Sequence, residues 1–312
     1  MTKTRRGKKE GLEGIFTVLM TGLTRTGGVD KESIRFSVDH LIEGGVHGLA
    51  TLGSSSECHY LSMVERKRIL DIVIDRTNGR APIMAGTGCI GTDETIRFSR
   101  YAKDAGAGYL LINLPTFLPI LEDDIYRHFA KVAKKVEMPI ILYNLPSASM
   151  DLTPERVVRL SEIENVVGIK EAMAETAPIK KVLELVDKPF SVFTGFSSNL
   201  LEVLKMGGAG VIDQMSNLDP KTFVALYGAC KKGRIEEAQV MQEKIQSYWS
   251  LTKHGGIAWI AATKEVMRSM GQPIRPLVRS PLPQLSTEQA MMIREELKTR
   301  GLLKQRLRQE EQ

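Results

Sequence analysis

Eight short apolar segments recur along the chain from Gly14 onward, and longer amphipathic segments separate them. The apolar segments are rich in Val, Ile and Leu and are bounded by polar residues or glycine, as buried parallel strands are. Few architectures hold so many strands of this kind, so this alternation restricts the fold more than any other feature. The predicted strands are Ile15–Met20, Gly48–Leu52, Pro82–Ala85, Tyr109–Ile112, Pro139–Tyr143, Val166–Ile169, Ser191–Thr194 and Gly210–Ile212.

The segments between the strands carry helix signals. Asp30 precedes the first of them, and Thr153 followed by Pro154 places a cap before a first helical turn. The predicted helices are one that begins within residues 30–33, and Ser62–Asp75, Thr92–Gly106, Leu121–Val136, Thr153–Ser161, Thr176–Val186 and Asn199–Met206. Alternating strands and helices indicate an α/β fold, and eight such units predict a closed (β/α)8 TIM barrel.

The alternative architecture is a doubly wound open sheet. That fold would require a Gly-x-Gly-x-x-Gly motif after the first strand, and residues 20–24 contain none. The chain after residue 221 shows no further strand signal, and it predicts a C-terminal helical extension with helices at Thr222–Lys232, Arg234–Leu251, Gly256–Met270 and Thr287–Thr299. We therefore predict the barrel at residues 14–220 and the helical region at 221–312, as a small domain or an oligomer contact.

Charge, apolar content and cysteine usage limit where the protein can reside and what it can bind. The first ten residues are basic, and we predict that residues 1–13 form a disordered, solvated tail; a nucleic-acid-binding arm is the alternative. No apolar run approaches the roughly 20 residues of a membrane helix, and no signal-peptide core follows the tail. Three widely spaced cysteines favour reduced thiols in a cytoplasmic protein, and the five histidines lack metal-ligand spacing. We expect neither nucleic-acid nor membrane partners, and a net charge of +6 is compatible with anionic substrates.

Lys170 closes the apolar run 166–169, which is an unusual place for a charge. A lysine at the end of a buried strand must pair its ammonium group, extend it to water, or lose the proton. The unprotonated amine is a nucleophile that attacks ketone carbonyls. The alternative is a solvated pair of Lys170 with Glu171 at a strand exit.

Other polar side chains follow the ends of other predicted strands, where the active sites of such barrels lie. Tyr143 ends the strand before that of Lys170, so both residues are expected at one edge of the barrel. Gly53-Ser54-Ser55-Ser56-Glu57 follows the second strand and offers N–H and O–H donors to a carboxylate. Taken singly, the tyrosine could be a core residue and the serines a helix-capping turn, but together they indicate one site.

The set predicts Schiff-base chemistry on a small-molecule 2-oxo acid. Lys170 attacks the keto group, and the carbinolamine loses water to give an iminium, which stabilises a carbanion at the neighbouring carbon. Tyr143 moves protons, and Ser54 and Ser55 hold the substrate carboxylate. The lysine imine is the only covalent group this chemistry needs, so we predict no cofactor and no metal.

These residues resemble the dihydrodipicolinate synthase / N-acetylneuraminate lyase family of Schiff-base lyases from Gly14 to about Leu303. The matching motifs are the Gly53–Glu57 segment for the family's Gly-Thr-Thr-Gly-Glu, Tyr143-Asn144-Leu145-Pro146, Gly168-Ile169-Lys170-Glu171, Thr194-Gly195 and Gly210-Val211-Ile212. The resemblance implies that Lys170 is the Schiff-base lysine and Tyr143 the proton donor. It also implies that Ser54, Ser55, Gly195 and the backbone of Ile212 line a pyruvate site, and that the protein is a homo-oligomer, a tetramer or a dimer.

The sequence departs from the synthases of this family at three positions. Phe117 stands in place of a tyrosine that reaches the neighbouring subunit's site, and Ala148 stands in place of an arginine that holds the second substrate's carboxylate. Ser147-Ala148-Ser149 is closer to the Thr-Ala-Thr of the 2-keto-3-deoxygluconate aldolases. Ser56 replaces the second glycine of Gly-Thr-Thr-Gly-Glu, which narrows the pocket or shifts the turn.

Three hypotheses follow. The first is a class I aldolase or hydro-lyase acting on pyruvate or a 2-oxo acid, such as a 2-keto-3-deoxy sugar acid. The second is 4-hydroxy-tetrahydrodipicolinate (dihydrodipicolinate) synthase, which condenses pyruvate with aspartate semialdehyde. The third is a non-catalytic barrel with a binding role.

Overall fold

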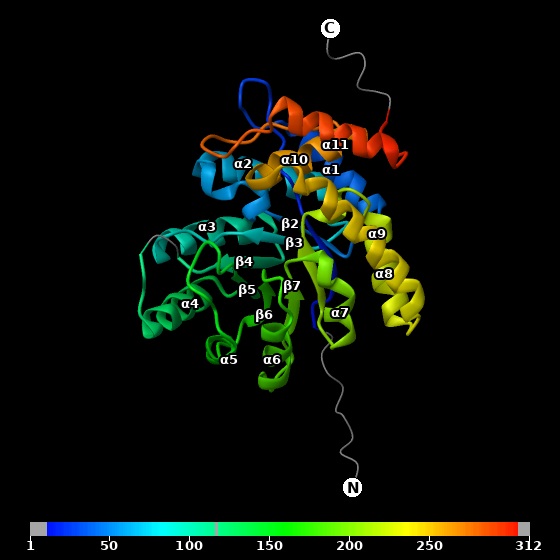
Figure 1. The fold of residues 1–312 in the computed structure, drawn as a ribbon. Coiled ribbons are helices and arrows are strands. Elements are labelled where there is room, and N and C mark those ends of the chain that lie inside the picture. The colour runs from blue at the N-terminus through cyan, green and yellow to red at the C-terminus, as the bar shows by residue number, and fades with distance from the viewer. Residues whose placement is uncertain (1–10, 116–117, 305–312) are drawn as a thin grey trace.

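Eight parallel strands close into a barrel in chain order, and helices lie around it (Figure 1). The structure is a computed structural model and describes residues 11–115 and 118–304. The strands are β1 Gly14–Val18, β2 Gly48–Thr51, β3 Ile83–Gly86, β4 Tyr109–Asn113, β5 Ile140–Asn144, β6 Val166–Glu171, β7 Ser191–Thr194 and β8 Gly210–Asp213. The predicted (β/α)8 TIM barrel is therefore confirmed, and the open sheet is wrong because β8 pairs with β1.

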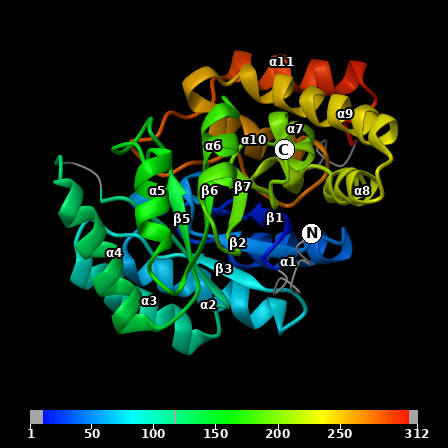
Figure 2. The ribbon, with the colours of Figure 1, turned by 90° about the horizontal axis from the view of Figure 1, so that it is seen from below.

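One α-helix follows each strand, and three more form the C-terminal extension. The first eight are α1 Lys31–Glu43, α2 Met63–Thr77, α3 Thr92–Ala105, α4 Glu122–Val136, α5 Pro154–Ser161, α6 Ala177–Leu185, α7 Leu200–Lys205 and α8 Pro220–Lys231. The extension consists of α9 Ile235–Lys253, α10 Trp259–Ser269 and α11 Thr287–Thr299, which lie side by side in both views (Figures 1 and 2). Short 3-10 turns occupy Ser54–Ser56, Cys58–Tyr60, Ser197–Asn199, Met215–Asn217 and Gly256–Ala258.

Helix ends follow the local capping chemistry. The Ser62 hydroxyl accepts from Glu65 N, and the Glu65 carboxylate accepts from Ser62 N, which closes a capping box at the start of α2. The same arrangement starts α11 at Ser286. α8 begins two residues earlier than predicted, because Asp219 accepts from Thr222 N and Pro220 fits the first turn.

Side-chain alternation along the strands divides the core into two layers. Inside the barrel, nine residues form a closed cluster: Phe16, Val18, Ala50, Met84, Leu111, Ile141, Tyr143, Phe193 and Ile212. The rings of Phe16 and Phe193 meet edge to face with centroids 5.7 Å apart. The apolar strand residues that alternate with these nine belong to the larger core that includes the helices, so both faces of the strands are buried.

The observed strand ends differ from the predicted ones where polar residues continue the ladder. β6 extends through Glu171, because Lys170 and Glu171 pair with β5 on one side and with β7 on the other. β1 ends at Val18 rather than at Met20, since its pairing with β2 stops there. Backbone pairing, and not side-chain polarity, therefore decides where these strands end.

Several predictions have no test in this structure. Most of the basic tail (residues 1–10) and Phe117 lie outside the described residues. The boundary at residue 220/221 also stays a prediction, because α8 contacts both β1 and α9. Within the described ranges, no helix is long and apolar enough to cross a membrane.

Candidate active site

Lys170 and Tyr143 are direct neighbours on adjacent strands. The β5–β6 register pairs Tyr143 with Lys170, and the lysine Nζ lies 4.2 Å from the centroid of the tyrosine ring. Both side chains are buried, with 4% and 7% of their surface exposed. The predicted pair therefore comes together at the carboxyl ends of the strands, on the inner side of the barrel where Tyr143 belongs to the interior cluster.

The predicted hydroxyl segment lies against this pair. Ser54 Oγ and Tyr143 Oη are 2.8 Å apart and share a hydrogen bond in which either atom can donate. Ser54–Ser56 forms a 3-10 turn after β2, and two bonds anchor it: Ser56 Oγ donates to Leu19 O, and Thr21 Oγ1 donates to Ser56 O. Tyr143 therefore has a partner for proton exchange on a rigid turn.

Gly195 packs directly on Lys170. A Cβ at residue 195 would lie 3.1 Å from Lys170 Cε and 2.8 Å from Ala172 Cβ. Its N–H donates to the carbonyl of Glu171 at 2.7 Å, so this backbone is also fixed. Only a glycine allows the β7 loop to approach Lys170 this closely.

The end of β8 completes the site on the remaining side. Ile212 is fully buried in the interior cluster, and Gln214, two residues further, accepts a hydrogen bond at Oε1 from Ser55 Oγ at 3.1 Å. Asp213 holds the flanking loops, because its carboxylate accepts from Ser197 N and Met215 N. Burial raises the pKa of Asp213, and these N–H groups and Lys170 oppose that rise.

Glu171 does not form the solvated pair with Lys170 that we weighed as an alternative. Its side chain is 1% exposed and accepts at Oε1 from Asn144 Nδ2 at 2.8 Å. Burial raises the pKa of Glu171 to about 8, because the Asn144 donor compensates only part of the desolvation and Asp151 adds repulsion. Asn144, and not Lys170, is therefore the hydrogen-bond partner of the Glu171 carboxyl.

Glu57, the last residue of the hydroxyl segment, connects the site to the C-terminal extension. Its carboxylate pairs with Lys264 on α10 and also accepts from Arg279 N at 2.6 Å. Lys264 additionally donates to Leu277 O, and both charged side chains are 0–1% exposed. Burial lowers the pKa of Lys264, and the Glu57 carboxylate offsets part of that effect.

We expect Lys264→Met to lower the free energy of unfolding by about 3–5 kcal/mol, because it leaves the Glu57 carboxylate buried without its cation. Urea unfolding measures this loss. Lys298→Met removes an exposed lysine that pairs with Glu295 and should cost no more than about 1 kcal/mol. Equal losses in the two variants would contradict a structural role for the buried pair.

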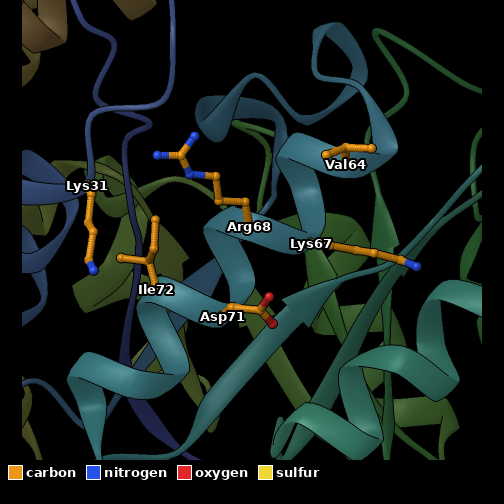
Figure 3. Close-up of a pocket in the computed structure, with 6 residues that line it drawn as sticks. All are labelled: Lys31, Val64, Lys67, Arg68, Asp71 and Ile72. Carbon is orange, nitrogen blue, oxygen red and sulfur yellow. The ribbon is translucent and has the colours of Figure 1, made fainter.

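A cavity elsewhere does not compete with this site. It has a volume of about 500 Å³, lies between α1 and α2, and is lined by Lys31, Val64, Lys67, Arg68, Asp71 and Ile72 (Figure 3). Two of its charged groups already have a partner, since Asp71 accepts from Tyr101 Oη and Lys67 lies over the Tyr101 ring. Among the residues the structure describes, no group of three or more His, Cys, Asp or Glu side chains could hold a metal ion.

Two contacts of the site escaped the sequence prediction. Gln214 lies beyond the predicted strand Gly210–Ile212, and its two-residue spacing from the buried Ile212 is the one signal that assigns it to the inner side. Lys264 lies in a helix predicted from its apolar pattern, and no local signal identifies Glu57 as its partner 207 residues away.

Comparison with known proteins gives consistent matches. A model described as the Dihydrodipicolinate synthetase family matches residues 11–300. A 4-hydroxy-tetrahydrodipicolinate synthase of Methanopyrus kandleri is 33% identical over 296 residues, covering 94% of this chain and 97% of that protein. Among solved structures, YagE, a prophage protein of the dihydrodipicolinic acid synthase family from E. coli K12 in complex with pyruvate, is 30% identical, with a TM-score of 0.88 over 93% of this chain and 99% of that one. The chloride-inhibited dihydrodipicolinate synthase of Acinetobacter baumannii, complexed with pyruvate, is 29% identical, with a TM-score of 0.87 over 94% and 100%.

Proposed function

The chain belongs to the dihydrodipicolinate synthetase family, whose members are lyases, and we propose on this premise that it binds pyruvate or another 2-oxo acid as an imine on Lys170. The observation that carries the proposal is the contact of Lys170 Nζ with the Tyr143 ring, at 4.2 Å, together with the 2.8 Å bond from Tyr143 to Ser54. Two solved relatives were crystallised with pyruvate, which supports this class of substrate.

The reaction begins with attack of the unprotonated Lys170 amine on the keto carbon. A proton of the attacking amine passes to the carbonyl oxygen, which gives the carbinolamine. The Tyr143 phenol then protonates this hydroxyl, which leaves as water and forms the iminium, and the resulting phenolate accepts the next proton. Removal of a proton from the methyl carbon of pyruvate then gives an enamine, the nucleophile that attacks an aldehyde. The reverse sequence cleaves a carbon–carbon bond and releases pyruvate. Ser54 exchanges the proton with Tyr143 throughout.

The Ser54–Ser55 turn binds the substrate carboxylate in this proposal. Hydroxyl and backbone N–H donors at a fixed turn provide directed hydrogen bonds to an anion. Gly195 and the backbone of Ile212 leave room for the substrate beside Lys170. No resident cofactor or metal takes part, because the lysine imine itself is the electron sink.

The overall reaction has two candidates, each favoured by a different observation. The relatives named 4-hydroxy-tetrahydrodipicolinate synthase favour synthase activity, the condensation of pyruvate with aspartate semialdehyde, over the aldolase or hydro-lyase hypothesis. Ala148 favours a 2-keto-3-deoxy sugar acid: it lies exposed in the β5–α5 loop, where it cannot hold a second carboxylate as an arginine would.

Borohydride trapping tests the imine. Incubation with pyruvate and reduction should add the mass of one reduced pyruvate adduct to the peptide that contains Lys170. A protein that stays unmodified would refute imine formation and favour the non-catalytic barrel. Parallel assays of condensation with aspartate semialdehyde and of pyruvate release from 2-keto-3-deoxy sugar acids then decide between the two substrates.

We further propose that the protein acts as a homo-oligomer, a dimer or a tetramer. Large apolar side chains are exposed on the segments that follow β2, β3 and β4, namely Val64, Ile90, Leu118 and Leu121, each at least 66% exposed. Exposed apolar groups gathered at one side of a barrel favour burial against another subunit.

A further inference from the structure

Gln214 occupies a position in the site that the reaction described above leaves without a role. It follows β8 on the inner side of the barrel, and only 6% of the residue is exposed. Its backbone carbonyl accepts from both N and Nδ2 of Asn217, at 3.1 and 2.7 Å, so its main chain is fixed. Its side-chain Oε1 accepts from Ser55 Oγ, while its Nε2 makes no hydrogen bond within residues 11–115 and 118–304.

This hydrogen bond directs the Ser55 hydroxyl proton toward Gln214 and not toward the substrate carboxylate that Ser55 is proposed to bind. A serine hydroxyl has one proton, and here it is directed at Gln214, so only lone pairs of Oγ face an incoming carboxylate. Lone pairs repel an anion. For the hydroxyl to donate to the substrate, the bond to Gln214 must be broken or reversed.

We propose that Gln214 is a positioning residue that turns its amide when substrate binds and so aims the Ser55 hydroxyl at the substrate carboxylate; this role rests on the function proposed above. A carboxamide presents an acceptor and a donor of nearly equal shape. A half-turn of the amide places Nε2 against Ser55 Oγ, and Nε2–H then donates to Oγ. The hydroxyl proton is released for the carboxylate, and no existing bond of Nε2 to a described residue is lost.

The proposal makes a glutamine necessary at this position rather than a glutamate. An ionised carboxylate only accepts, so Gln214→Glu would hold the Ser55 proton permanently and would repel the substrate anion. Gln214→Met keeps the side-chain volume and removes both hydrogen-bonding ends. The titratable groups linked to one another in this site are Asp213, Lys170 and Tyr143, and every Gln214 variant retains them.

Reductive trapping with cyanoborohydride, measured as a function of pyruvate concentration, tests this role. We expect Gln214→Met to raise the half-saturating pyruvate concentration roughly 3- to 10-fold, the usual effect of one lost hydrogen bond, without changing the maximal rate. Gln214→Glu should raise it roughly 10- to 100-fold at alkaline pH and less at acidic pH, where the protonated carboxyl can donate. Gln246→Glu, the same charge change at an exposed glutamine of α9, should behave as the native protein.

A double-variant cycle separates positioning from simple packing. If Gln214 acts through Ser55, then Ser55→Ala combined with Gln214→Met should bind pyruvate no more weakly than Ser55→Ala alone. Fully additive losses, or an unchanged half-saturation in both Gln214 variants, would overturn the role of Gln214 while the imine stands. Absence of trapping in the native protein would overturn the proposed function and this role together. Thermal unfolding identifies any variant that fails to fold. If Gln214→Glu does not fold, Gln214→Met and the double-variant cycle still test the role of Gln214.

Discussion

We expect Lys170→Ala to abolish turnover and to remove all borohydride trapping with pyruvate. Lys170 carries the amine that lies over the Tyr143 ring, at 4.2 Å, so the variant lacks the nucleophile that we propose forms the imine. Mass spectrometry of the reduced protein and a pyruvate-release or condensation assay measure the two losses. The barrel should stay folded, because the substitution places no new polar group in the buried interior.

The control for this variant is Lys180→Ala, which removes an exposed lysine of α6 that lies near Glu184. It should trap pyruvate as the native protein does. Trapping that persists in Lys170→Ala, with the adduct on another lysine, would assign the chemistry elsewhere and refute the site. Circular dichroism of both variants shows whether a loss of trapping reflects lost folding.

Tyr143→Phe keeps the ring over Lys170 and removes only the hydroxyl. Proton transfer to the departing oxygen then lacks its donor, and the bond to Ser54 is lost. We expect the rates of iminium formation and turnover to fall about 10²- to 10⁴-fold, the usual contribution of an acid–base group. Trapping should still reach the native extent at long times, because Lys170 remains.

Tyr101→Phe is the matched control for this variant. It removes a tyrosine hydroxyl that donates to Asp71 on the outside of the barrel. Its trapping rate should equal that of the native protein. An unchanged rate in Tyr143→Phe would remove Tyr143 from the mechanism, whereas a slow rate in both variants would point to an effect on the fold.

Much of the site could be predicted because the barrel repeats. Successive strands of a (β/α)8 barrel are neighbours, so two residues at the ends of consecutive strands come together. Tyr143 and Lys170 fulfil this expectation through the β5–β6 register. The prediction was less accurate at strand ends, since polarity suggested that β6 stops at Ile169 while backbone pairing carries it to Glu171.

Side-chain polarity also gave the wrong partner for Glu171. The sequence offered a solvated Lys170–Glu171 pair as the alternative to a reactive lysine. In the structure the two side chains alternate across the strand, and Glu171 is buried against Asn144 on β5. Adjacent residues of a strand point to opposite faces, so sequence adjacency does not make them partners.

The sequence by itself predicted the architecture and the candidate lysine, tyrosine and serine turn, because the apolar period of strands and the caps of helices are local properties. Only the tertiary structure decided which distant groups meet. Gln214 contacts Ser55 across 159 residues because β8 closes on β1. Glu57 pairs with Lys264 because the C-terminal extension returns to the strand ends. Such contacts depend on how the closed chain packs and on the cost of burying unpaired polar groups, which no local pattern records.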